Sequence, residues 1–567
     1  MNESAFFEEK MKQTKEFAGL LCNLYLVALA AVLPLYTDGS YWMIGDTKYL
    51  FFRNVTLAGL GIGAVVMLIA GVGERLRGNV PESGVSGFPQ DAAPESRPRG
   101  KRWSALDTAV LLYGVTVCLS ALLSSYQETA WYGFREWYMG AVSQLLFVGI
   151  YFFISRSYDG SSYPLWLWSI SFFVVVVLGL CNRFGTDPVG LLAGFNSGDW
   201  EYSHMISTIG NINWFCGYAS VAIAIPLSGY LYGGRGWRQL ALYPVSAAGL
   251  TLLVIQGCDT GIVVAAVCFG ICVLLGSSNK SVMRRTFFLA AGVSVLLPIY
   301  GRIVTLMGTE ALKALPSDGI GIDRLLWSGW WMIGAVCLLL GIFRERAARA
   351  LCAEEGRRHR IRIGIAVFAR VLILAVLVVG VLFFLRRSRG GEPWGSGRGV
   401  LWKLAIKGFL QNDFVGKLLG VGPDCFAEYI YSTSPPEELL TLGGRWAGAV
   451  YANAHNEWLN HLVNLGIMGT GCYLAVFAAG IIKCRKAALC QGGEKRIAVA
   501  GILAILLYGV VSCTCFQQCL STPLFFTVLG LCESSLRRGG EQTENRQRTA
   551  ERKKGVEIVY EMGKIQD

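Results

Sequence analysis

Residues 239–276 read QLALYPVSAAGLTLLVIQGCDTGIVVAAVCFGICVLLG, and this stretch decides the fold class. It contains two apolar runs of helical length, and its one charged side chain, Asp259, lies between them. A helix of about 20 mostly apolar residues can cross the hydrocarbon core of a bilayer. The stretch therefore predicts two consecutive transmembrane helices.

Similar runs recur along most of the 567 residues. Hydrophobic residues make up 53% of the chain and charged residues 16%, whereas a soluble domain carries roughly 25% charged residues. We therefore predict an all-α polytopic membrane protein with about fourteen transmembrane helices and no sizeable soluble domain. The expected spans are 17–36, 49–72, 105–124, 133–155, 163–181, 207–231, 239–256, 260–276, 286–306, 325–343, 363–385, 457–482, 497–515 and 519–536.

The net charge of +12 follows the pattern of a membrane protein. Lys and Arg gather in alternate connections between the spans, as in 74–103 and 344–362, and basic connections stay on the cytoplasmic side. Both termini are thus expected in the cytoplasm. No basic face suggests a nucleic-acid partner, and the cysteines lie mostly in apolar runs without metal-ligand spacing, so we expect no metal and no cofactor.

The chain divides into four parts on this pattern. Residues 1–385 hold about eleven spans and a flexible cytoplasmic connection at 74–103, which is rich in Pro, Gly and Ser. Residues 386–456 form a large extracytoplasmic loop. About three further spans occupy 457–536, and residues 537–567 form a polar cytoplasmic tail that we expect to be disordered.

The large loop is basic, which is unusual outside the membrane and suggests an anionic ligand. Within it, residues 398–411 read RGVLWKLAIKGFLQ. At helical period one face is apolar, so we expect an amphipathic helix on the membrane surface with Arg398 at its entry. Lys403 and Lys407 fall on another face, where they can touch lipid headgroups. The expected apolar face consists of Trp402, Ala405, Ile406, Phe409 and Leu410.

Two further segments of the loop stand out. Gly420, Gly422 and Pro423 are typical of a tight turn. Residues 451–470 read YANAHNEWLNHLVNLGIMGT, with His455 and Asn456 where the loop meets the next span. From the residues alone, His455 is as easily a hydrogen-bonded structural group as a functional one. His461 points to another side of the helix, and we expect its replacement to be nearly silent. Small residues in the span, Gly466 and Gly469, allow close helix packing.

These segments resemble the O-antigen ligase and O-antigen polymerase superfamily of membrane glycosyltransferases (Wzy/WaaL type). The resemblance covers about residues 205–535 and has four parts in the family's order. They are the Ile209-Gly-Asn-Ile-Asn213 element, the helix that follows Gly397-Arg398, the Gly-Val-Gly-Pro-x-x-Phe turn at 420–426, and His455-Asn456 followed after nine residues by Gly-x-x-Gly-Thr. One part departs from the family: a Ser-Arg-Gly element is replaced by Cys258-Asp259-Thr260-Gly261, so its arginine is absent.

The resemblance implies a GT-C-like enzyme in the bacterial cytoplasmic membrane. It implies transfer of a glycan, with inversion and without a metal, from an undecaprenyl-diphosphate-linked donor to a hydroxyl of a glycan, lipid or cell-wall acceptor outside the membrane. Arg398 then binds the diphosphate and His455 is the general base. Weaker expectations for donor or acceptor binding are Lys403, Lys407, Arg445, Asn456, Asn211 and Asn213, with Arg183 or Arg445 as a second cation for the diphosphate.

Other functions stay open at this point. A protein O-oligosaccharyltransferase of the same family would differ only in its acceptor. A transporter of polysaccharide or lipid-linked glycan would carry ionisable residues in mid-span and repeated halves, and the chain shows few of the former and none of the latter. A non-catalytic scaffold would leave the ordered loop motifs unexplained.

Overall fold

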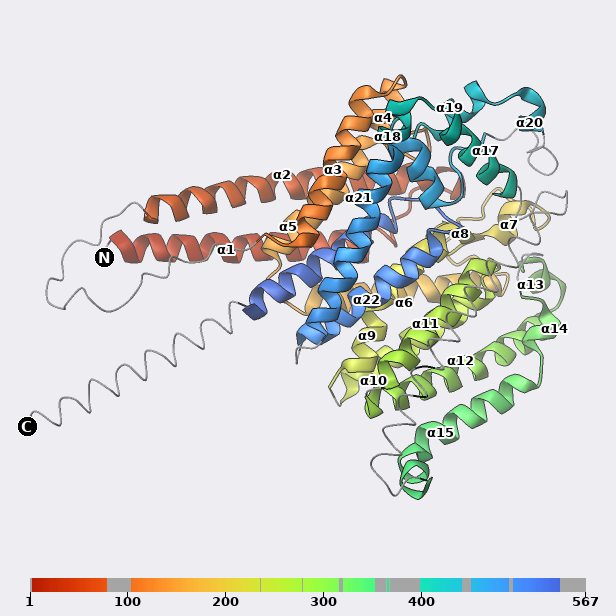
Figure 1. Ribbon diagram of the computed structural model, residues 1–567. Helices are drawn as coiled ribbons and strands as arrows, with labels where there is room; N and C mark the ends of the chain where they lie inside the picture. The colour runs from red at the N-terminus through yellow and green to blue at the C-terminus, as the bar shows by residue number, and fades with distance from the viewer. Residues whose placement is uncertain are drawn as a thin grey trace, which may run out of the picture.

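The computed structural model describes residues 3–78, 103–234, 236–277, 279–315, 320–351, 364, 367, 398–440, 450–488 and 493–540. Nearly every element in this part of the chain is a helix (Figure 1). Its single sheet is a short antiparallel hairpin of β1 (Met205–Ile206) and β2 (Gly210–Asn211), with Met205 opposite Asn211. Arg445, nearly all of the expected span 363–385 and most of the connection 74–103 lie outside the described residues.

Ten segments of the described chain are helices long and apolar enough to cross a membrane, so the architecture is that of a polytopic α-helical membrane protein. They are Glu9–Val32, Tyr41–Ala70, Ala105–Leu123, Tyr163–Arg183, Ile212–Tyr232, Trp237–Ile255, Asp259–Ser277, Lys280–Met307, Ile322–Phe343 and Glu457–Ala487. Three further expected spans are also helical, namely α5 (Ala141–Ser157), α22 (Gly493–Val511) and a C-terminal helix at 522–540. The expected span 133–155 begins later than predicted, because residues 133–140 form a bent segment outside the helix. The total of fourteen stays a prediction.

Many of the long helices pack against their neighbours in sequence. Helices α1 (Glu3–Val27) and α2 (Ile44–Gly78) lie side by side, and α10 (Trp237–Ile255), α11 (Asp259–Ser277), α12 (Lys280–Met307) and α15 (Gly329–Leu351) follow one another (Figure 1). The C-terminal helices pack against earlier ones: α21 (Glu457–Ala487) contacts α3 (Ala105–Leu123) as well as α22, and α22 contacts the segment 212–232. Between these groups lie α6 (Tyr163–Arg183) and the enclosed pair α8 (Ile212–Ala222) and α9 (Ala224–Tyr232).

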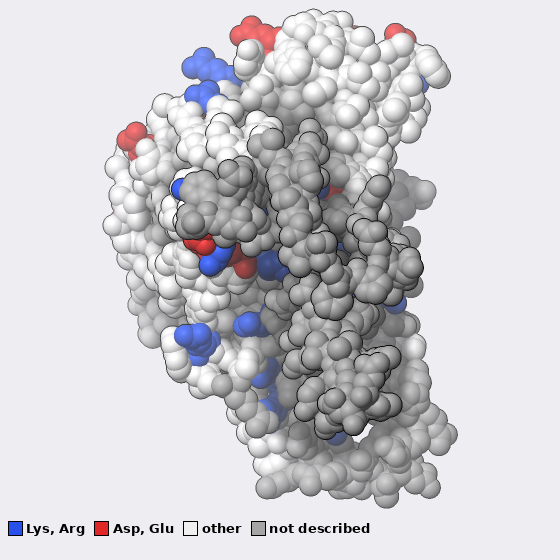
Figure 2. All heavy atoms as spheres, turned by 90° about the vertical axis from the view of Figure 1, so that its left-hand side faces the viewer, with Lys and Arg blue, Asp and Glu red and all other residues white. Residues whose placement is uncertain are grey.

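The short elements gather at the ends of the long helices that lie opposite the described ends of the chain (Figure 1). They are η2 (Tyr41–Met43), α4 (Gln127–Tyr132), α7 (Trp200–His204), α13 (Thr309–Lys313), α14 (Ile322–Leu325), α17 (Arg398–Gln411), α18 (Phe414–Leu419), α19 (Phe426–Thr433) and α20 (Pro436–Leu440). We call this the loop end. At the other end the described part of the exposed face is rich in Lys and Arg (Figure 2), which is the charge pattern of a cytoplasmic face. The orientation itself stays a prediction.

Helix α21 is broken at Gly466, where φ is +64°. Because of the break, two backbone carbonyl oxygens of α21 accept hydrogen bonds from the loop. The amide of Val421 donates to the oxygen of Val463 at 3.1 Å, and the amide of Gly422 donates to the oxygen of Asn464 at 3.0 Å. A Cβ at Gly466 would lie 2.5 Å from the backbone of residue 418. Gly466 was predicted to serve close packing between helices. The structure shows a more specific role, because the break at Gly466 allows the Gly420–Pro423 turn to pack against α21.

A buried ion-pair cluster closes the end opposite the loop end. The Asp107 carboxylate of α3 accepts from Arg156 of α5 at 2.7 Å and from Arg537 of the C-terminal helix at 2.5 Å. Lys483 of α21 pairs with Glu533 at 2.9 Å. Residues 537–540 are helical and Arg537 belongs to this cluster, so the predicted start of a disordered tail at residue 537 is wrong. The later part of that tail lies outside the described residues.

Candidate functional site

Arg398 and Asn213 meet at the loop end, although they lie in different parts of the sequence. Arg398 is the first residue of α17, and its Nη2 donates to the Asn213 Oδ1 at 2.9 Å. Asn213 lies in the first turn of α8, and Asn211 caps that helix by accepting from the Asn213 amide at 2.8 Å and from its Nδ2 at 3.0 Å. The structure thus joins two of the motifs that the sequence singled out.

Two cysteines complete the surroundings of Asn213, and sequence reasoning missed both as members of this site. The Cys258 Sγ donates to the same Asn213 Oδ1 at 3.2 Å, and the Cys515 Sγ donates to the Asn213 backbone oxygen at 3.4 Å. Cys258 stands where the resembled family has its Ser-Arg-Gly element. That alignment was the one signal that could have placed Cys258 here.

His455 lies close enough to Arg398 for the guanidinium charge to lower the pKa of its ring. Burial and, second, the Arg398 guanidinium lower the pKa of His455 from 6.5 to about 3, so the ring is neutral at physiological pH. The ring packs edge-on against Phe516, with 5.1 Å between the ring centroids, and this contact contributes to its burial. Its Nδ1 is buried and has no hydrogen-bond partner among the described residues.

The backbone of His455 is also unusual. Its φ is +47°, a region that residues other than glycine rarely adopt, and the Asn453 Oδ1 supports the turn by accepting from the His455 amide at 3.0 Å. Asn456 follows as the N-cap of α21, where its side chain accepts from the Leu459 amide and donates to the oxygen of Cys513. Asn456 therefore fixes the backbone beside His455. Strained backbone of this kind is concentrated at functional sites.

Three carboxylates at the loop end each have partners other than His455. Asp424 accepts from the amides of Phe134 and Met139 at 2.8 and 2.9 Å. Glu428 accepts from the Thr129 hydroxyl at 2.7 Å. Glu457 is buried and accepts from the hydroxyls of Ser512, Tyr508 and Tyr473. In the described part of the chain none of the three is bonded to His455.

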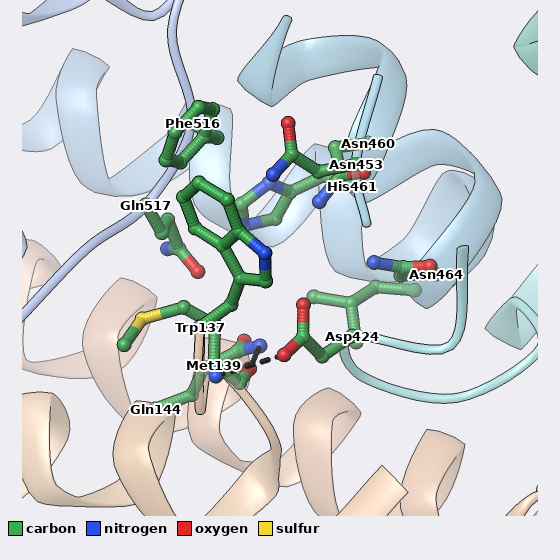
Figure 3. Close-up of a pocket in the computed structure, with 11 residues that line it drawn as sticks. Trp137, Met139, Gln144, Asp424, Asn453, Asn460, His461, Asn464, Phe516 and Gln517 are labelled. Carbon is green, nitrogen blue, oxygen red and sulfur yellow. Dashed lines mark hydrogen bonds between the residues drawn. The ribbon is translucent and has the colours of Figure 1, made fainter. Parts of the chain in front are cut away.

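A small pocket is lined in part by Phe516, the ring that packs against His455. Trp137 lies in the middle of the residues that line it, with Asp424 on one side and Phe516 and Gln517 on the other, and His461 behind it (Figure 3). Burial raises the pKa of the Asp424 carboxyl to about 7, with Glu428 adding to the effect. His461 is buried and stacks on Tyr473, with 4.3 Å between the ring centroids. We therefore no longer expect the replacement of His461 to be silent.

The remaining predicted residues lie away from this centre. Lys407 forms an ion pair with Glu438 of α20, and Lys403 is exposed. Arg183 is fully buried at the end of α6, where its Nη1 donates to the oxygen of Ala314 at 2.7 Å. The structure shows no contact between Arg183 and Arg398. Gly469 lies three residues beyond the break, facing Leu465 of its own helix.

The predicted apolar face of α17 is partly wrong. Of its members only Ala405 is buried, while Ile406 and Leu410 are exposed. The helix buries a neighbouring face against α19 and α21, made of Leu401, Leu404, Ala405 and Gly408. Lys403 lies on the same exposed stripe as Ile406 and Leu410, three and seven residues before them, and not on a separate face.

Comparisons with known proteins add no family to this picture. No protein-family model matches the chain, and no curated protein matches it either.

Proposed function

We propose that this chain is a membrane glycosyltransferase of the O-antigen ligase or polymerase type. It transfers a glycan from an undecaprenyl-diphosphate-linked donor to an acceptor hydroxyl at the outer face of a bacterial cytoplasmic membrane. The observation that supports the proposal is the contact of Arg398 with Asn213 at the loop end, together with the effect of the Arg398 charge on the pKa of His455. Arg398 and His455 come from opposite ends of one loop, and Arg398 lies beside the start of α8.

Arg398 supplies the charge that such a reaction needs. Cleavage of the bond to the diphosphate leaves an anion, and a guanidinium can donate two parallel hydrogen bonds to phosphate oxygens. The Asn213 amide is neutral, so it positions the guanidinium without cancelling its charge. Donors placed in this way before the reaction stabilise the charge that develops on the leaving group.

His455 supplies the base. The acceptor hydroxyl is a weak nucleophile, and the neutral imidazole can accept its proton as the new glycosidic bond forms. Burial and the Arg398 charge hold the pKa of His455 at about 3 without ligand. A bound diphosphate offsets the charge of Arg398, so the pKa of His455 rises when the donor is in place and the base becomes stronger. Attack opposite the diphosphate inverts the anomeric centre.

The test uses a deletion strain of the source bacterium, because the sugars of the donor need not be known. Deletion should cause undecaprenyl-diphosphate-linked glycan to accumulate, as measured by mass spectrometry of lipid extracts. Wild-type protein and Lys403→Ala should remove the accumulated donor, whereas Arg398→Ala and His455→Ala should not, at equal membrane abundance. A deletion strain with unchanged lipid-linked glycans would refute the proposal.

A further inference from the structure

Helix α17 presents an apolar stripe to the outside, opposite the face that packs on the protein. Ile406 and Leu410 are 46% and 61% exposed, and they stand four residues apart, so they lie one above the other on the helix. Lys403 precedes Ile406 on the same stripe and is also exposed. The stripe therefore begins with a cation and continues with large aliphatic side chains.

Helix α18 extends this stripe. Phe414 is 78% exposed and Val415 is 49% exposed. Asp413 caps the helix by accepting from the Gly416 amide at 2.6 Å, which fixes the direction in which α18 leaves α17. We call Ile406, Leu410, Phe414 and Val415 the apolar ridge. Contiguous exposed apolar side chains of this size on a protein surface usually mark an interaction site.

The ridge lies level with the outer boundary of the membrane. From the break at Gly466 to the end of α21 at Ala487 the helix is about 33 Å long at 1.5 Å per residue, close to the thickness of about 30 Å of a hydrocarbon core. Gly466 touches the backbone at Leu418 of α18. Helix α3 ends at the same level, where the Ser124 Oγ donates to the oxygen of Val421 at 2.6 Å.

Exposed apolar side chains also lie near these contacts on both helices. Leu122 and Leu123 at the end of α3 are exposed, and so are Ile467 and Met468 just past the break in α21. The two spanning helices thus expose apolar side chains at the level where α18 contacts them. The cation at the start of the stripe stands where the headgroups of anionic lipids lie.

We propose that the apolar ridge inserts among the acyl chains of the outer leaflet, with Lys403 beside the lipid phosphates. The partner is the phospholipid bilayer itself. The four apolar side chains of the ridge hold α17 at a fixed height and so set the height of Arg398 above the membrane, whereas the loss of Lys403 alone leaves the ridge inserted. This inference does not depend on glycosyl transfer, because it concerns the surface that faces away from Asn213.

Photo-crosslinking of the full chain tests the proposal. The reagent p-benzoylphenylalanine replaces Phe414, Leu410 or, as the control, the exposed Glu437 of α20. The protein is placed in nanodiscs of phosphatidylcholine and phosphatidylglycerol without any polyprenyl lipid, irradiated, and weighed by intact mass spectrometry. Phospholipid adducts at 414 and 410, at least tenfold above those at 437, are the expected result.

Three results would overturn the inference. They are adducts at 414 no more frequent than at 437, adducts mainly to a second copy of the chain, and adducts that form only after a polyprenyl lipid is added. Because Phe414 is replaced by a larger aromatic residue on the surface, the fold is retained, and size exclusion of each variant checks this.

Discussion

The guanidinium of Arg398 donates a hydrogen bond of 2.9 Å to the side-chain oxygen of Asn213, which lies 185 residues earlier in the chain. The contact brings the start of the large loop to the start of α8. Its partner is an uncharged amide, and no ion pair of Arg398 is found in the described residues. The arginine is therefore positioned with its charge available for an anion.

Arg398→Ala should reduce glycan transfer by about a hundredfold or more, since the loss of one well-placed donor to a developing charge costs about 3 kcal/mol. Arg398→Lys should recover only part of the rate, because lysine keeps the charge but not the paired hydrogen bonds. Initial rates with a purified lipid-linked donor measure this. Lys403→Ala is the matched control, and an equal loss there would mean that Arg398 only anchors the loop.

Asn213 positions the Arg398 guanidinium. Two substitutions at Asn213 distinguish the loss of this positioning from the loss of the Arg398 charge. Asn213→Ala removes the hydrogen bond, and it should lower kcat moderately while Arg398 keeps its charge. Asn213→Asp places a carboxylate against the guanidinium, which pairs with it and repels the diphosphate. The aspartate variant should therefore raise the donor KM far more than the alanine variant does. Equal KM values for the two would argue against an anion at Arg398.

His455→Ala should lower turnover by about a hundred- to ten-thousandfold and leave donor binding nearly intact. With a pKa of about 3, His455 of the ligand-free protein is already neutral at pH 6 to 8, so kcat/KM should not rise through the ordinary histidine range. A pH–rate profile from purified protein in nanodiscs measures this, and EDTA should have no effect. A folded His455→Ala protein with normal turnover would remove the base from the mechanism.

Asp424 should make the folded protein less stable as pH rises. Its pKa is raised from 3.8 to about 7, so the folded state binds this proton more tightly than the unfolded state does. The resulting stabilisation is complete below pH 3.8 and is lost as pH rises through 7, with one pKa unit worth about 1.4 kcal/mol. Asp424→Asn keeps an acceptor for the two backbone amides, and its Tm should fall less than that of the wild type from about pH 5 to about pH 8. Parallel Tm curves would contradict the assignment.

Gly466→Ala should destabilise the fold by about 2 kcal/mol or more, because a side chain there adopts an unfavourable φ and meets the backbone at Leu418. Gly471→Ala is the matched control: it lies in the same helix, and a Cβ there meets nothing within 4 Å. Thermal unfolding in detergent compares the two. If Gly471→Ala is as destabilising as Gly466→Ala, the break in α21 does not explain why residue 466 is a glycine.

The spans were predictable because apolar runs of membrane-crossing length carry their own signal. The ends of the spans were harder to predict. Residues 133–140 include several aromatic side chains, and these pack in the loop end and not in a spanning helix. The exposed side of α17 was assigned wrongly for a similar reason. Periodicity finds an apolar stripe, but it cannot tell whether protein or lipid covers it.

Of the candidate site, sequence motifs supplied Arg398, Asn213 and His455, and the structure places Arg398 in contact with Asn213. Contacts between Asn213 and the thiols of Cys258 and Cys515 were not predictable, because they depend on how α8, α11 and α22 end side by side. The pKa of His455 also depends on burial by Phe516, a residue 61 positions away in the sequence.

The ion pair between Asp107 and Arg537 has a consequence for how the protein is made. Arg537 lies 430 residues after its partner, so the ribosome adds these 430 residues before the ion pair can form. Until then the buried carboxylate has Arg156 as its only cationic partner among the described residues. A nascent or truncated chain that stops before residue 537 therefore has an incompletely paired buried charge between α3 and α5.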